Sequence, residues 1–377
     1  MTMTPNTLAG RVQLRPGVAP PATIRSSRPD LLSRLAPGRR ADEMPGLLGA
    51  VFTLCAAAHR LTATAALRAA RGEPAADPST AAQTLRLTTA REQILRISHD
   101  WPRLLREDGR GDEGALLLRT CPLWRDDLVP DDRLDALPGW IAHKWLGHAP
   151  ADWLQRHDAD PTGWAARWVE QTERFGTPGA LVHLLHRVGP LARALATPGR
   201  SLLPAATDWA TLGQAMADKP AFCARPHWHG HAADTGPWSR RANAAAEPEA
   251  GTAPLSASVW QRLIARLVEV LRLSLPPHAD GALRLDHGAL DLGGGAGLAW
   301  CEMARGLLVH RAQLDADGQR VQDWQVLAPT EWNFHPEGTL AHALATLRED
   351  DPGRRDAAAR LLAVAFDPCV EFEVLHA

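Results

Sequence analysis

Apolar residues recur at helical spacing along much of the chain, and helix-breaking residues mark where these stretches end. Residues 47–71 are rich in alanine and leucine, contain no proline and are followed by Gly72 and Pro74, which favour a helix end. Ser79 is a candidate N-cap for a second helix. The same reasoning predicts helices over 47–71, 79–99, 134–146, 164–175, 180–186, 209–217, 258–273 and 354–366.

Two regions break the helical pattern. Residues 283–292 alternate apolar and polar side chains, as a half-buried strand does. Residues 306–314 and 320–327 flank the turn sequence Asp315-Ala-Asp-Gly318, which predicts a hairpin. The glycine run 293–297 lacks the Lys-Ser or Lys-Thr that follows a phosphate-binding loop, so a tight turn between strands is favoured over that alternative.

These patterns predict a mainly α fold with a small antiparallel β part (α+β), in a single domain over 1–377. Residues 1–45 are rich in Pro, Arg and Ser, so we expect a short strand followed by irregular structure. Residues 232–254 contain few large apolar side chains towards their end and are expected to form a surface loop.

Composition limits the classes of function. The chain has 377 residues, 45% of them hydrophobic, and a net charge of −2 from 41 basic and 43 acidic residues, so it has no broad electrostatic attraction for nucleic acid or an anionic membrane. Without a long apolar segment or a signal-peptide core near its start, we expect a cytoplasmic protein. Its five cysteines are scattered, which indicates reduced thiols rather than a disulfide framework.

Histidines and cysteines supply the candidate chemistry. His227, His229 and His231 alternate in a way that suits a metal site on a strand, although Pro226 and Gly230 favour a loop without metal. Their role stays open at this stage.

Cys55 and His59 are four residues apart in the expected helix 47–71, so an imidazole N–H there is placed to bond a thiolate. The alternative is a buried free cysteine above an unrelated histidine. At the other end, Cys369 and His376 lie within nine residues of the C-terminus.

Five segments, in order, resemble the large subunit of nickel-iron hydrogenases. Phe52-Thr-Leu-Cys55-Ala-Ala-Ala-His59 is similar to its Cys-x-x-Cys-x-x-x-His motif, and Asp367-Pro-Cys369-Val-Glu-Phe372 to its Asp-Pro-Cys-x-x-Cys motif. The other segments are Thr235-Gly-Pro-Trp-Ser-Arg240, Glu302-Met-Ala-Arg-Gly306 and Ala328-Pro-Thr-Glu-Trp-Asn333, which resemble its Val-Gly-Pro-Leu-Ala-Arg, Glu-x-Pro-Arg-Gly and Pro-Thr-Thr-Trp-Asn segments. The resemblance runs from about residue 47 to the end and implies a helical hydrogenase-like core.

Departures from the family pattern affect its catalytic metals. Four family cysteines hold nickel and iron, whereas here Phe52 and Phe372 replace two of them. The family's acid in its N-terminal motif aligns loosely with Ala9, and the chain stops one residue after His376, so no cleavable tail is expected. We therefore expect no nickel and no enzyme activity; a divergent redox enzyme is the least favoured alternative.

The iron side of the pocket is retained. In the family, iron carries two cyanides and one carbon monoxide, and the resemblance implies that Arg305 and Thr330 donate hydrogen bonds to the cyanides. Pro329 is implied to help form an apolar wall for carbon monoxide, together with Ala304, Leu307 and Ala328. Cys55 and Cys369 are the implied metal ligands and His59 their neighbour, although Cys369 matches a family position that binds nickel only.

A chain with this combination resembles the HupK/HoxV-type hydrogenase accessory proteins. The resemblance implies a non-catalytic scaffold that carries or assembles a transient Fe(CN)2(CO) group for delivery to a hydrogenase large subunit. Its implied partners are a chaperone complex of the HypC/HypD type and the large-subunit precursor. The alternative is a cofactor-free decoy of the large subunit that binds the same chaperones.

Overall fold

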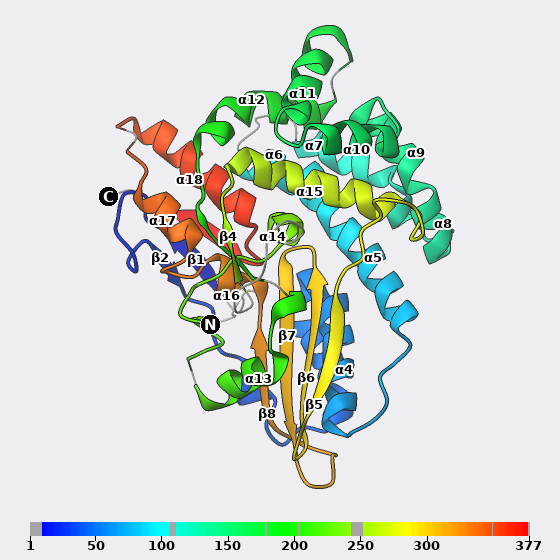
Figure 1. Ribbon diagram of the computed structural model, residues 1–377, viewed down its shortest axis with the longest axis vertical. Coiled ribbons are helices and arrows are strands. Elements are labelled where there is room, and N and C mark those ends of the chain that lie inside the picture. The colour runs from blue at the N-terminus through cyan, green and yellow to red at the C-terminus, as the bar shows by residue number, and fades with distance from the viewer. Residues whose placement is uncertain are drawn as a thin grey trace.

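A four-stranded antiparallel sheet forms one end of the molecule, and a body of helices forms the other (Figure 1). This computed structural model describes residues 10–105, 111–177, 179–202, 204–219, 221–242, 252–348 and 350–375. The helices are α2 (Leu32–Leu35), α3 (Met44–Val51), α4 (Ala56–Ala70), α5 (Pro78–Leu95), α6 (Trp101–Leu104), α7 (Gly111–Arg119), α8 (Pro130–Asp135), α9 (Leu137–Ile141), α10 (Pro150–Ala159), α11 (Trp164–Phe175), α12 (Ala180–Ala194), α13 (Trp209–Asp218), α14 (Pro237–Ala242), α15 (Val259–Ser274), α16 (Pro329–Asn333), α17 (Thr339–Ala345) and α18 (Pro352–Phe366). The strands are β1 (Arg11–Leu14), β2 (Ile24–Ser26), β3 (Gly199–Leu202), β4 (Thr252–Leu255), β5 (His287–Gly293), β6 (Ala296–Met303), β7 (Gly306–Leu314), β8 (Val321–Leu327) and β9 (Glu371–Val374). The predicted α+β class is confirmed.

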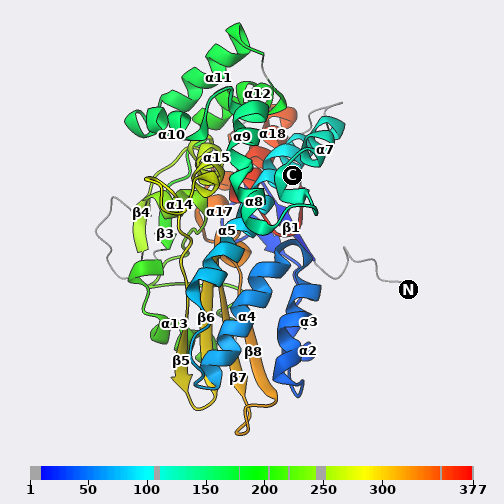
Figure 2. The ribbon, with the colours of Figure 1, turned by 90° about the vertical axis from the view of Figure 1, so that its right-hand side faces the viewer.

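The large sheet has the order β5-β6-β7-β8 and is covered by α4 on one face and α13 on the other (Figure 2). The predicted hairpin is confirmed as β7 and β8, and the glycine run forms the turn between β5 and β6. Gly297 lies where β6 crosses α4: a Cβ there would come within 2.3 Å of the Ala66 carbonyl oxygen. The absence of a side chain therefore lets helix and sheet pack closely.

The single helix predicted over 47–71 is wrong. The chain bends by 107° between residues 41–51 and 53–70, because Phe52 adopts φ −106° and ψ 64° and a 3-10 segment (Thr53–Cys55) follows it. No proline or glycine stands at this break, so the sequence pattern predicted an unbroken helix. As a result Cys55 is the last residue of the 3-10 segment and the N-cap of α4, and it does not lie within an α-helix.

Helix α15 runs through the interior of the helical body and is buried on almost every side. Ser258 and Gln261 form a capping box at its start, in which each side chain accepts a hydrogen bond from the other's backbone. Arg262, Arg266 and Glu269 are buried on this helix, so each needs a charged partner. Arg262 pairs with Asp234, Arg266 with Asp367, and Glu269 with Arg240.

The two ends of the chain meet in a second, three-stranded sheet of order β2-β1-β9. β1 pairs with β9 in parallel, with Val12 opposite Phe372. Asp367 ends α18 with a left-handed backbone (φ 55°) and redirects the chain into Cys369 and β9. This arrangement carries the C-terminal cysteine motif back towards the N-terminal half; His376 and Ala9 lie outside the described residues.

Two expectations for irregular segments need correction. Residues 232–254 do not form a surface loop in their described parts, since Asp234 and Ser239 are buried, α14 starts at Pro237, and β4 pairs with β3. The described part of the N-terminal segment 1–45, residues 10–45, holds two strands and α2, and α3 starts at Met44. Within the described residues no single helix is long and apolar enough to cross a membrane; only the bent pair 41–51 and 53–70 has the required length and composition.

Candidate metal centre

Cys55 and Cys369 are brought into contact at the junction between α4 and the C-terminal segment. Their sulfurs share a hydrogen bond, and Cys55 is 4% exposed. The hydrogen bond from Cys55 lowers the pKa of Cys369 well below its ordinary value, and the Arg305 guanidinium adds to this effect. The same bond, with burial, raises the pKa of Cys55. The pair is thus arranged as one thiol donating to one thiolate.

The other three cysteines have no such bias towards the thiolate. Burial raises the pKa of Cys121, Cys223 and Cys301 to about 12, so each is a protonated thiol at neutral pH. Cys301 accepts a hydrogen bond from the Thr62 hydroxyl at 3.1 Å. Only the Cys55–Cys369 pair, among the described cysteines, has the electrostatic surroundings of a metal ligand.

Thr330 contacts Cys369, and the Arg305 guanidinium interacts electrostatically with both sulfurs. The Thr330 hydroxyl accepts a hydrogen bond from the Cys369 backbone N–H at 3.3 Å and donates to the Cys369 sulfur. Arg305 is 4% exposed and its NH1 donates to Glu92 at 2.8 Å. Its Nε has no hydrogen-bond partner among the described residues, although Asp367 lies 3.8 Å away.

Asp367 anchors the cysteine-bearing segment. Its carboxylate pairs with Arg96 Nε at 2.6 Å and Arg266 NH1 at 3.0 Å. Burial alone would raise the pKa of Asp367, but these guanidiniums and Arg305 hold it below the ordinary value. Three elements, α5 with its π-helical extension (Arg96–Asp100), α15 and the end of α18, are therefore tied together by one buried carboxylate.

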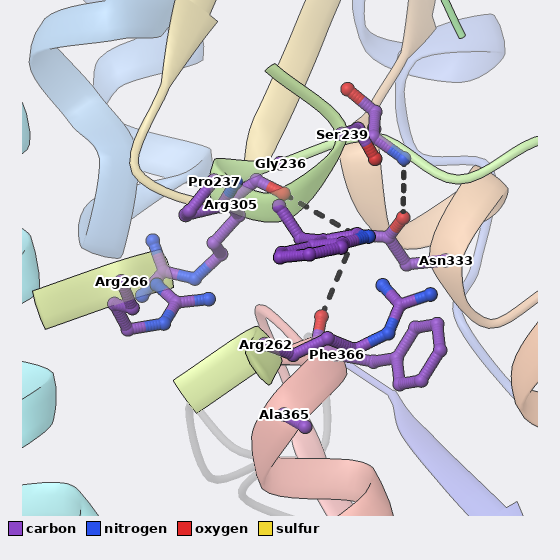
Figure 3. Close-up of a pocket in the computed structure, with 11 residues that line it drawn as sticks. Gly236, Pro237, Ser239, Arg262, Arg266, Arg305, Asn333, Ala365 and Phe366 are labelled. Atoms are coloured by element: carbon purple, nitrogen blue, oxygen red, sulfur yellow. Dashed lines mark hydrogen bonds between the residues drawn. The ribbon is translucent and has the colours of Figure 1, made fainter. Parts of the chain in front are cut away.

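Asn333 connects the end of α18 to two further segments through backbone groups. Its side-chain oxygen accepts from the Thr235 N–H at 2.9 Å, and its Nδ2 donates to the carbonyl oxygens of Arg305 at 3.3 Å and Phe366 at 3.5 Å (Figure 3). It lines a small cavity of about 10 Å³ that the side chains of Arg262 and Arg305 also reach. Asn333 therefore links backbone groups of Thr235, Arg305 and Phe366, which are far apart in the sequence.

Glu92 is an acid that interacts with both Cys55 and Arg305. Burial raises its pKa to about 7, while Arg305 counteracts part of that effect. Sequence reasoning missed Glu92, Arg96 and Arg266, because helical spacing places them on buried faces without indicating a partner. The Asp-Pro step before Cys369 was the one available signal for Asp367, since it accompanies the cysteine in the family motif.

His59 does not adopt the predicted role towards Cys55. Its Nδ1 lies 3.0 Å from Nε2 of His310 on β7, and its ring stacks on Phe52 with centroids 4.0 Å apart. The bend at Phe52 takes Cys55 out of the helix that was expected to align the two side chains. Burial lowers the pKa of both His59 and His310, so the pair is neutral and shares one hydrogen bond.

The proposed apolar wall is divided. Pro329 and Ala328 are buried next to Thr330, and Ala304 is buried beside Arg305. Leu307, in contrast, packs in a separate cluster with Val309 and Trp332. Pro329 and Ala328 therefore lie beside the residue that contacts Cys369, whereas Leu307 packs in a different hydrophobic cluster.

Known proteins resemble this chain over nearly its whole length. HoxV of Cupriavidus necator, a hydrogenase expression/formation protein, is 36% identical over 386 residues that cover 97% of this chain and 95% of HoxV. HupK of Bradyrhizobium diazoefficiens is 32% identical over 92% of this chain and 90% of its own. The chain belongs to this family of hydrogenase expression/formation proteins. HupV of Azotobacter chroococcum is a further member at 31% identity, with 98% and 100% covered.

This chain has the fold of hydrogenase large subunits. The Ni-Fe-Se hydrogenase from Desulfovibrio vulgaris Hildenborough in its reduced state matches with a TM-score of 0.53 at 13% identity, covering 94% of this chain and 93% of the hydrogenase chain. No family model matches the chain. The resemblance inferred from the five segments is confirmed. The structure adds that the two motif cysteines, Cys55 and Cys369, meet.

Proposed function

We propose that this protein acts in the formation of a nickel-iron hydrogenase as a non-catalytic scaffold. In this role it carries or assembles the Fe(CN)2(CO) group and passes it to a hydrogenase large subunit. The names of its relatives, which are hydrogenase expression/formation proteins, support the general role. The chemistry of the Cys55–Cys369 site supports the Fe(CN)2(CO) group as the specific cargo.

The observation that carries this proposal is the contact between Cys55 and Cys369, which are 314 positions apart in the sequence. Thiolates are soft ligands and suit low-spin ferrous iron. Cys369 is already biased towards the thiolate, and Cys55 would release its proton when iron binds. Two sulfur ligands hold the group less firmly than four and would permit its transfer.

The hydrogen-bond donors suit anionic cyanides. Arg305 keeps a buried Nε without a hydrogen-bond partner among the described residues, and the Thr330 hydroxyl is adjacent to the sulfurs. A charge-assisted hydrogen bond contributes about 1.5–3 kcal/mol. Glu92 already accepts from NH1 of Arg305, so it orients the guanidinium and leaves Nε for a ligand.

The proposed scaffold has no catalytic nickel site, because phenylalanines replace two of the four cysteines that hydrogenase large subunits have. Phe52 stacks on His59, and Phe372 packs against the hydrophobic core. Neither hydrocarbon ring can bind nickel, and two sulfurs do not supply a four-sulfur site. We place the scaffold in the cytoplasm, with a HypC/HypD-type chaperone complex as donor and the large-subunit precursor as acceptor.

Infrared spectroscopy of the protein produced together with hydrogenase maturation proteins tests the cargo directly. We expect cyanide and carbonyl stretches, about one iron per chain and negligible nickel. Cys55→Ala and Cys369→Ala should each abolish these bands, and the double variant should add nothing further, since a ligand pair acts as one unit. Thr330→Val should keep the bands but shift the cyanide frequencies.

Cys223→Ala is the matched control, because Cys223 is a partly buried thiol outside the site. Its bands should equal those of the parent protein. Normal loading in Cys55→Ala would contradict the proposal, as would one nickel per chain.

A cofactor-free decoy is a second candidate, because the Glu92 carboxylate already neutralises the Arg305 guanidinium. Such a protein would bind the chaperone complex and show no cyanide stretch, and its binding would survive loss of both cysteines.

A further inference from the structure

A second group of metal-ligating side chains lies away from the cysteine pair. One ligand atom from each of His227, His335 and Glu337 lies within 4.8 Å of the other two. His227 Nε2 and Glu337 Oε2 are 3.3 Å apart. Two ligands at about 2.1 Å from a tetrahedral Zn²⁺ are separated by about 3.4 Å, so this pair already has the required spacing.

The three side chains come from two rigid turns. His227 precedes a tight hairpin in which Trp228 and His231 exchange backbone hydrogen bonds of 2.8 and 3.0 Å. His229 and Gly230 form its tip, with φ values of 48° and 81°. The alternating histidines therefore do not share a strand face, and of the three only His227 contributes a ligand atom to the cluster.

His335 and Glu337 lie in the turn between α16 and α17. His335 is 1% exposed, and its Nδ1 accepts a hydrogen bond from the Glu337 backbone N–H at 3.1 Å. Its Nε2 is buried and has no hydrogen-bond partner among the described residues, so the imidazole keeps a ring nitrogen that no other described group uses. The His227 and His335 rings stand at 86° to each other with centroids 4.5 Å apart, so they do not stack.

The cluster opens onto a pocket of about 460 Å³. His227 and Glu337 line it, as do His231 and His342 from other segments. Two of the three ligands, His227 and Glu337, line this open pocket, which leaves coordination positions for water or an incoming ligand. Such a site binds and releases its ion readily.

We propose that His227, His335 and Glu337 form an exchangeable binding site for a divalent first-row transition-metal ion, with Zn²⁺ and Co²⁺ as the ions that can be used to probe it. Two imidazoles and one carboxylate favour such borderline ions over Ca²⁺ and Mg²⁺, which prefer oxygen ligands. The site is separate from the cysteine pair and does not depend on the proposed iron cargo.

Co²⁺ titration of the full-length, tag-free protein tests the proposal. The experiment uses a Cys55→Ser, Cys369→Ser background, so that thiolates do not contribute to the visible absorption. We expect about one Co²⁺ per chain, displaced by Zn²⁺. His227→Ala and Glu337→Gln change exposed side chains and should each weaken binding at least about tenfold, because even outer-sphere partners typically contribute ten- to a hundredfold.

His229→Asn and His231→Ala are the matched controls. Both histidines are in the same hairpin, and Asn tolerates the left-handed backbone at 229; their Co²⁺ affinity should equal that of the background. The proposal is overturned if the background binds no Co²⁺, if His227→Ala binds unchanged, or if the controls lose as much affinity as His227→Ala. Each of these outcomes leaves the cyanide bands, and hence the cargo proposal, unaffected.

Discussion

Asp367 shows how one buried carboxylate determines the position of a candidate ligand, Cys369, two residues away. It combines a left-handed backbone, which side chains other than glycine adopt at a cost, with ion pairs to Arg96 and Arg266. The ion pairs hold the turn that presents Cys369 to Cys55. Removing the charge should therefore loosen this turn and leave buried guanidiniums without their counter-charge.

Asp367→Asn is expected to lower the free energy of unfolding at pH 7 by about 3–5 kcal/mol, the usual consequence of breaking a buried ion pair. The folded-state pKa of Asp367 lies below its ordinary value, so this stabilisation is present above about pH 4 and is lost as pH falls through the folded pKa. Urea unfolding between pH 7 and pH 3 measures it.

Asp280→Asn, at an exposed position, serves as the control for this measurement and should change stability by less than about 0.5 kcal/mol. An equal loss of stability for Asp367→Asn at pH 7 and pH 3 would contradict the ion-pair explanation.

Residue types in a motif identified the candidate ligands but not the charged side chains around them. Cys55, Cys369, Arg305 and Thr330 were all identified from the sequence, and the structure brings them together. Glu92 and Arg266 were not, because a buried ion pair leaves no mark on helical periodicity. His59 was misassigned for a related reason: spacing within a helix has meaning only where the helix is continuous.

At the scale of elements, the sequence predicted regular helices and the hairpin well and failed where the chain bends or pairs over long range. α11 covers Trp164–Phe175 and β7 covers Gly306–Leu314, as expected. The break at Phe52 and the parallel pairing of β1 with β9 depend on tertiary contacts that local patterns do not encode. α14 was missed because its buried residues are mostly small or polar.

Helix α15 has both a local signal and a tertiary role, which makes its start a useful test. Ser258→Ala removes one half of the capping box and should lower the free energy of unfolding by about 1 kcal/mol. Ser256→Ala, two residues earlier and exposed, should be neutral. Guanidinium unfolding of both variants checks this, and equal midpoints for the two would argue against a stabilising cap.

At the scale of the whole molecule, the two ends of the sequence close on each other. β1 and β9 lie side by side, and the Cys55 and Cys369 sulfurs meet although 314 positions separate them. A covalent link between these sulfurs would cross-link almost the entire chain. Closing so long a loop reduces the entropy of the unfolded chain more than a short cross-link does.

Treatment of the cargo-free protein with diamide should therefore form a Cys55–Cys369 disulfide. The two thiols give up two protons and two electrons, and diamide accepts them as it becomes the hydrazine. We expect a rise in the thermal midpoint, with stabilisation of up to about 5 kcal/mol, and its reversal by dithiothreitol. Peptide mapping without reductant identifies the bond, and Cys369→Ser should show no rise.

Loading with the iron group should protect both sulfurs from diamide, because the cargo would occupy the same lone pairs that form the disulfide. The oxidised protein should in turn accept no cargo until it is reduced. If diamide instead links Cys223 to either residue, or leaves the pair unreacted, the two thiols are not as close in solution as their shared hydrogen bond requires. That result would also remove the main support for a two-sulfur iron site.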